Sequence, residues 1–274
     1  MARAVRERTG CAVFGYDANA DVVGAAIADG VLDGKLCEHY EDVDMLLVAL
    51  YPLDVVDIIS EAATKLKKGC IVVDCTGVKK IICDGLSEKL AGLGLRFIGG
   101  HPMAGKEVAG WANACADLFD GASMILCRDE FTDRAALDEA RVFFPKLGFA
   151  QVVETTAAEH DAVIAYTSQL AHVVSSAYIK SPTLEKRYGF SAGSFKDMTR
   201  VAKLNEEMWA DLFLANKDAL SSEIAEISRH LAEYGDALAS GDRDRLVELL
   251  RDGRIRKEDD TAKEQSIADK KADG

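Results

Sequence analysis

One histidine stands where an apolar run ends among glycines and a proline. The run at 95–98 leads into Gly99-Gly100-His101-Pro102. A strand that ends in this way places its loop at the carboxyl edge of the sheet, where open α/β sheets bind ligands. Because imidazole titrates near neutral pH, His101 is the first candidate for a group that accepts a proton in a reaction. The alternative is a tight turn in which His101 is only a polar cap.

The second candidate is an acid that follows an early apolar run. Residues 12–17 read as a short strand that ends on Asp17, and a helix over 1–8 precedes it. In a dinucleotide-binding βαβ unit, an acid about 20 residues after a glycine turn binds the ribose hydroxyl, and Asp17 has that place. Its charge would repel a 2′-phosphate, which favours NAD over NADP. The alternative is an Asp that merely ends a strand.

The glycine-rich phosphate turn of such a unit is not in the sequence, which contains no GxGxxG. Counting back about 20 residues from Asp17 places that turn before Met1. We therefore expect a first strand and a phosphate loop upstream of Met1, and poor NAD binding by the chain as written.

Apolar runs alternate with helical patterns through the first half of the chain. Such alternation predicts an α/β, Rossmann-like fold with a doubly wound, mainly parallel sheet, N-terminally incomplete, over residues 1–154. The expected strands lie at 45–50, 70–74, 95–98, 123–127 and 150–153, and the expected helices between them at 55–66, 78–90 and 134–147.

From Thr156 onward the pattern is helical. Thr156-Ala-Ala-Glu159 is a capping box, and apolar residues recur at three- and four-residue spacing over 206–239. One helix of about 30 residues would span about 45 Å, so we expect it to pack against a partner subunit. We place an all-α substrate-binding and dimerisation domain at 155–250 and a charged, disordered tail at 251–274.

Composition restricts the class of ligand. A formal net charge of −13 disfavours nucleic acid and anionic membranes and favours a small-molecule ligand. All seven cysteines lie between Cys11 and Cys127 without CxxC spacing, so we expect a cytoplasmic protein with neither a disulfide framework nor a metal site. We also expect no secretion signal and no membrane span.

Three motifs, in order, resemble the prephenate dehydrogenase family, which also includes arogenate dehydrogenases. Residues 100–105 with 116–121 are similar to its signature loop, 159–161 with 166–172 to the first helix of its dimerisation domain, and 191–200 with Met208, Trp209 and Asn216 to its substrate-binding segment. The resemblance implies a homodimer that converts prephenate and NAD+ to 4-hydroxyphenylpyruvate, a step towards tyrosine.

The resemblance also implies roles for single residues. His101 would accept the proton of the ring hydroxyl, and Arg200 would hold a carboxylate of the substrate with Asp197 orienting it. The residues that match the family's substrate pocket are Arg200, His172, Asp197, Gly193 and Trp209.

Bland alternatives stay open for four of these residues. Arg200 and Asp197 would then be ordinary surface charges, and His172 and Trp209 would be core side chains.

Two positions depart from the family pattern. Thr76-Gly77-Val78-Lys79 stands where many members have Gly-Ser-Val-Lys, so the serine that assists the catalytic histidine is absent and Thr76 would supply the hydroxyl. Gln169 stands where many members have a histidine. Two other functions remain open: an arogenate dehydrogenase, and a non-catalytic dimerisation partner of an intact subunit.

Overall fold

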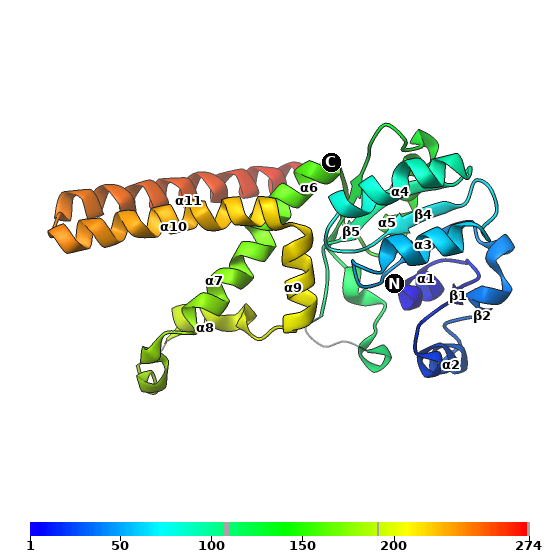
Figure 1. Cartoon of the computed structure of the whole chain (residues 1–274), viewed down its shortest axis with the longest axis horizontal. Coiled ribbons are helices and arrows are strands. Elements are labelled where there is room, and N and C mark those ends of the chain that lie inside the picture. The colour runs from blue at the N-terminus through cyan, green and yellow to red at the C-terminus, as the bar shows by residue number, and fades with distance from the viewer. Residues whose placement is uncertain (107–109, 191, 273–274) are drawn as a thin grey trace. The chain divides into compact units, whose positions relative to one another are not determined.

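Five strands form the main sheet (Figure 1). β3 (Met45–Val48), β4 (Ile71–Asp74) and β5 (Arg96–Pro102) are parallel, β5 pairs antiparallel with β6 (Ser123–Cys127), and β6 runs parallel to β7 (Gln151–Thr155). Every residue of β4 is buried, as expected for a sheet that is covered on both faces. The prediction of a mainly parallel α/β sheet followed by helices is confirmed. The computed structural model describes residues 1–106, 110–190 and 192–272.

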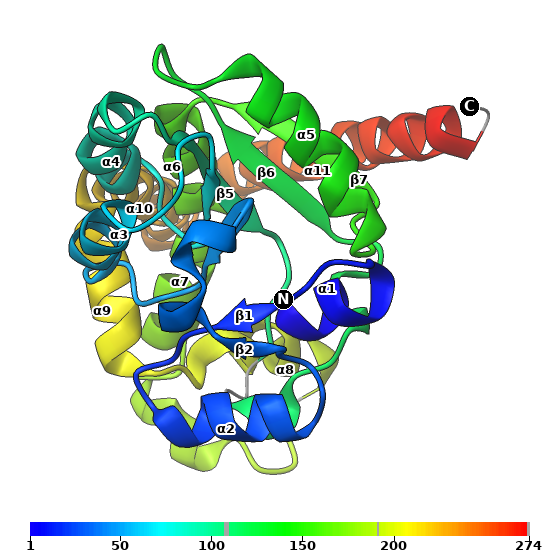
Figure 2. The same cartoon turned by 90° about the vertical axis from the view of Figure 1, so that its right-hand side faces the viewer.

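Helices cover both faces of this sheet (Figure 2). α3 (Val55–Ala63) and α4 (Lys80–Gly92) bury one hydrophobic cluster, which includes Leu86. α1 (Ala2–Arg8) and α5 (Arg134–Lys146) bury the other cluster on the opposite face. The two clusters anchor the sheet from both sides and fix the carboxyl ends of its parallel strands.

A smaller parallel sheet consists of β1 (Phe14–Gly15) and β2 (Gly34–Lys35), connected through α2 (Ala20–Ala28). Asp33, just before β2, is hydrogen-bonded to Val13, just before β1. Its backbone N–H donates to Val13 O at 2.7 Å, and its carboxylate accepts from Val13 N at 2.8 Å. Among the described residues no strand ladder joins this pair to β3.

The chain continues as helices after β7. α6 (Ala157–Ile164) begins at the predicted capping box and passes through a π-helical turn (Ala165–Gln169) into α7 (Leu170–Tyr178). α8 (Gly193–Thr199) and α9 (Glu206–Ala215) follow. None of the helices in the described part of the chain is both long and apolar enough to cross a membrane.

The prediction of one helix over 206–239 is wrong, because the helix breaks at Asn216. The backbone there, at φ −119° and ψ 29°, leaves helical geometry before α10 (Lys217–Ser240) begins. A buried polar network explains the break. Asn216 is 6% exposed, and its Nδ2 donates to the backbone oxygen of Asp161 and to Oε1 of Gln169, both at 2.8 Å.

By its internal contacts the chain forms two compact units, Met1–Leu220 and Ser221–Gly274. In the second unit, α10 leads through a turn at Gly241 into α11 (Arg243–Ala272). The expected disordered tail from 251 is therefore wrong as far as Ala272, and residues 273–274 lie outside the description. Charge pairs one turn apart, Arg254–Glu258 and Asp252–Arg256, support this solvated helix.

Candidate active site

His101 lies within β5, which extends beyond the strand predicted at 95–98, and pairs with Ile125 of β6. Glycine at the preceding position permits this close packing. A Cβ on Gly100 would lie 2.6 Å from the backbone oxygen of Asp74, so β5 can lie against the end of β4 only if that position has no side chain. Residues 107–109 of the following loop are outside the described part.

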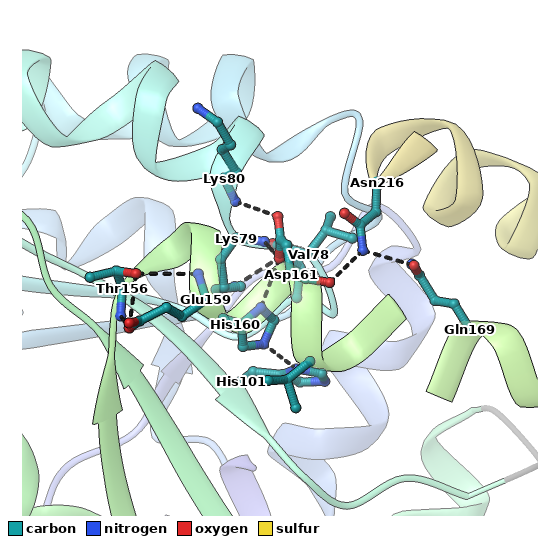
Figure 3. Close-up of polar contacts among 12 residues, drawn as sticks. Val78, Lys79, Lys80, His101, Thr156, Glu159, His160, Asp161, Gln169 and Asn216 are labelled. Atoms are coloured by element: carbon teal, nitrogen blue, oxygen red, sulfur yellow. Dashed lines mark hydrogen bonds and ion pairs between the residues drawn. The ribbon is translucent and has the colours of Figure 1, made fainter. Parts of the chain in front are cut away.

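A second histidine contacts His101 (Figure 3). Nδ1 of His101 lies 2.8 Å from Nε2 of His160, and Nδ1 of His160 lies 2.7 Å from Oδ1 of Asp161. His160 and Asp161 are 2% and 4% exposed. This His-Asp pair belongs to the motif at 159–161, but neither residue is among the predicted site residues. Its position just after the capping-box Glu159 was the available signal.

Asp161 joins this pair to the start of α4. Its two carboxylate oxygens accept from the backbone N–H groups of Lys79 and Lys80, each at 2.8 Å. Burial acts to raise the pKa of Asp161, but the hydrogen bonds from His160 and from both amides outweigh it and hold the pKa below its usual value. Asp161 is therefore an ionised, acceptor-only group at neutral pH.

This anion determines which imidazole nitrogens carry protons. Asp161 can only accept, so Nδ1 of His160 is the N–H donor and Nε2 of the same ring is an acceptor. That acceptor takes the Nδ1–H of His101, which leaves the lone pair of His101 on Nε2. This nitrogen faces Gly77, where an added Cβ would lie 3.8 Å from it.

The pKa of His101 is lowered to about 3, mainly by burial and also by the neighbouring His160 and Lys79, against the opposing effect of Asp161. His101 is thus neutral at physiological pH. A neutral imidazole with Nε2 unprotonated can accept a hydrogen bond from a hydroxyl group.

Thr76 is not in hydrogen-bond contact with His101 among the described residues. Its hydroxyl lies 3.1 Å from both Asp74 Oδ2 and Val78 O. Lys79 is fully buried, pairs with Asp74 and donates to the backbone oxygen of Gly100 at 2.5 Å. Thr76 and this ion pair therefore hold the β4–α4 connection against β5.

Two of the predicted pocket residues lie together. The rings of His172 and Trp209 stack with centroids 3.8 Å apart and an interplanar angle of 27°, and His172 Nδ1 donates to Ser168 O at 2.9 Å. Leu212 lies one turn after Trp209 on α9, and its Cδ2 is 3.6 Å from the position of a Cβ on Gly77. One face of α9 thus extends from His172 towards the Nε2 side of His101.

The other predicted pocket residues belong to α8 and the turn after it. Gly193, Asp197 and Arg200 are exposed, and the turn Arg200–Ala202 packs on α7, the helix of His172. Ser191, the first residue of the matching segment, lies outside the described residues.

Gln169 is 2% exposed and does not extend into solvent. Its Nε2 donates to Leu212 O at 3.2 Å and its Oε1 accepts from Asn216. Gln169 thus fixes α9 beside α7, so the position that is histidine in many relatives serves here as a support.

Asp17 is exposed at the carboxyl end of β1, and its Oδ1 accepts from the backbone N–H of Asn19 at 2.8 Å. This is the expected place for a ribose-binding acid. Asp17 therefore fits the ribose-binding part of a dinucleotide site. The sequence contains no GxGxxG turn to bind the pyrophosphate. In the described ranges no cluster of side chains has the composition of a metal site.

The α/β sheet, the acid after β1 and the half-buried histidine at the carboxyl edge define a dehydrogenase-like protein. Residues 1–154 match the family model "Prephenate dehydrogenase, nucleotide-binding domain", and residues 156–252 match "Prephenate dehydrogenase, dimerization domain". The chain therefore belongs to the prephenate dehydrogenase family.

Individual relatives agree with this membership. The chain is 27% identical to the prephenate dehydrogenase of Lactococcus lactis over 85% of its own length and 66% of that protein. It is 31% identical to the cyclohexadienyl dehydrogenase of Zymomonas mobilis over 82% and 78% of the two chains. Its fold is similar to prephenate dehydrogenase from A. aeolicus in complex with hydroxyphenyl propionate and NAD+, with a TM-score of 0.78, 27% identity and coverage of 94% and 92%.

Proposed function

We propose that this protein oxidatively decarboxylates prephenate to 4-hydroxyphenylpyruvate with NAD+, a step towards tyrosine. The observation that carries the proposal is the neutral His101, whose unprotonated Nε2 faces Gly77 near the α9 face of Trp209. The A. aeolicus relative binds NAD+ and hydroxyphenyl propionate together, which supports an aromatic product and a nicotinamide cofactor.

His101 is the proton acceptor in this reaction. NAD+, when bound, supplies the acceptor for the hydride that leaves the ring carbon bearing the hydroxyl. As that carbon becomes a carbonyl, the hydroxyl proton moves to Nε2 of His101. The ring carboxylate then departs as carbon dioxide, and formation of the aromatic ring drives the step.

The remaining residues bind and orient. Arg200 holds a substrate carboxylate through its planar guanidinium, with Asp197 three residues before it to orient the group. His172, Trp209 and Gly193 line the pocket. Asp17 receives the ribose of NAD+ and disfavours NADP.

We also propose that the protein is a homodimer that assembles through residues 156–252, the part that matches a dimerization domain. All seven cysteines are free thiols, which fits a reducing cytoplasm.

Initial rates of NADH formation test the proposed function. Because the sequence contains no GxGxxG turn and we expect weak NAD binding, each cofactor is titrated to saturation. The chain is assayed in this way with prephenate and with arogenate, each with NAD+ and NADP+, beside His101→Gln. We expect turnover of prephenate with NAD+ and at least about a 100-fold lower kcat in the variant. A preference for arogenate would reassign the substrate. NAD+ binding without turnover of either compound would contradict the proposal.

A further inference from the structure

His101 has a difficulty as a proton acceptor in isolation. Its ring is largely enclosed, and the fully buried ammonium of Lys79 lies close enough to oppose a positive charge on it. Lys79 is paired with Asp74, but it still lowers the pKa of His101, so burial and this neighbour both disfavour a proton that stays on His101. The structure offers another location for that charge.

We propose that His160 and Asp161 extend His101 into a proton relay, in which the charge of the substrate's hydroxyl proton rests on His160 beside the Asp161 carboxylate. This inference depends on the proposed function for its substrate but not for its geometry. The relay consists of two hydrogen bonds (Figure 3). One joins Nδ1 of His101 to Nε2 of His160 at 2.8 Å, and the other joins Nδ1 of His160 to Oδ1 of Asp161 at 2.7 Å.

The proton transfers balance at each atom. The substrate O–H bond breaks as an N–H bond forms at Nε2 of His101. The Nδ1–H bond of His101 then breaks as an N–H bond forms at Nε2 of His160. The Nδ1–H group of His160 stays intact and keeps its hydrogen bond to Asp161. After carbon dioxide leaves, the reverse transfers return the proton to the phenolate oxygen of the product. The proton is therefore borrowed, and the overall reaction releases none.

The charges around the relay favour this direction. Asp161 lies directly against His160, whereas Lys79 lowers the pKa of His101. Lys80 at the start of α4 and Cys127 of β6 also interact with Asp161, and Asp74 at the end of β4 pairs with Lys79. Burial raises the pKa of Cys127 to about 12, so this thiol stays neutral.

Nitrogen-15 NMR of the full chain tests the relay without any turnover. At neutral pH, we expect His101 to carry its proton on Nδ1 and to show a bare Nε2. As the pH falls from about 8 to about 5, His101 stays neutral. Protonation of His101 within this range would overturn the proposal, as would the opposite tautomer of His101. This test stands even where the activity assay refutes the proposed function.

Kinetics of His160→Gln separate proton transfer from positioning. A glutamine can accept from His101 Nδ1 and donate to Asp161, so it preserves both contacts but takes no proton. We expect kcat to fall about 100-fold with KM changed less than about threefold, and the pH profile of kcat to shift. Retention of kcat in this variant would show that His160 only positions His101. His230→Gln, on exposed α10, is the control and should leave both constants unchanged.

Discussion

At the scale of single residues, the site depends on what surrounds each side chain. His101 was predictable because glycines and a proline flank it in sequence. His160 was not assigned a role, because a histidine in the first turn of a helix is usually an ordinary capping or core residue. Only the folded chain brings Nε2 of His160 to 2.8 Å from Nδ1 of His101 on β5. The role of Thr76 stays a prediction; in this structure its hydroxyl contacts Asp74 and Val78.

The buried, neutral state of His101 predicts a pH dependence of stability. The folded pKa is about 3, whereas an unfolded histidine titrates near pH 6.5. Below about pH 6.5 the unfolded chain binds a proton that the folded chain does not, so stability falls as the pH falls. We expect the free energy of unfolding, measured with urea between about pH 6 and pH 4, to fall more steeply with falling pH for wild type than for His101→Gln. The difference in slope should reach up to about 1.4 kcal/mol per pH unit. Equal slopes would contradict the buried, neutral histidine.

The buried pair of Lys79 and Asp74 predicts a large asymmetry in stability. Lys79→Met leaves Asp74 as an unpaired buried anion, which costs about 3–5 kcal/mol of unfolding free energy. Asp74→Asn added to this variant should recover much of that loss. Lys65→Met, which breaks the exposed pair with Glu61, is the control and should cost less than about 1 kcal/mol. Equal losses at Lys79 and Lys65 would be inconsistent with a buried charge pair.

At the scale of elements, periodicity predicted the existence of helices and strands better than their ends. The helix over 206–239 has apolar spacing throughout, and no local signal marks the break at Asn216. The break results from partners far away in sequence, Asp161 and Gln169, which single-sequence patterns do not contain. Likewise, β5 extends to Pro102 because β6 pairs with it.

Asn216 should hold α9 in its place beside α7. Asn216→Ala removes two buried donations and is expected to lower the unfolding free energy by about 1–3 kcal/mol. Because α9 carries Trp209, the KM for prephenate should also rise. Gln169→Ala shares one of these bonds, so the double variant should cost less than the sum of the single variants. Additive losses in chemical denaturation would contradict a joint network.

The close approach of β5 to β4 predicts that Gly100 accepts no side chain. Gly100→Ala would place a Cβ 2.6 Å from Asp74 O and should cost about 1–3 kcal/mol or more, with loss of the His101 contacts. Gly105→Ala is the matched control, because a Cβ there meets no atom within 4 Å. Thermal melting of both variants gives the comparison, and equal melting temperatures would refute the packing argument.

At the scale of the whole molecule, the order of an α/β sheet followed by helices was predictable from alternating patterns and a capping box. The expected tail was not, because charged, apolar-poor sequence is typical both of disorder and of a solvated helix. In α11 the decisive feature is the sign of charges four residues apart, as in Arg254–Glu258. Contacts of Asp161 with Lys79 and Lys80 connect α6 to α4 across the predicted domain boundary after residue 154, and that boundary stays a prediction.

The central claim is that His101 accepts the hydroxyl proton of prephenate through Nε2. The most direct measurement is single-turnover formation of NADH by wild type and by His101→Gln at saturating prephenate and NAD+, with binding of both ligands determined separately. The account predicts that the variant binds both ligands within about threefold of wild type and forms NADH at least about 100-fold more slowly. Equal rates of NADH formation in the two proteins would contradict it.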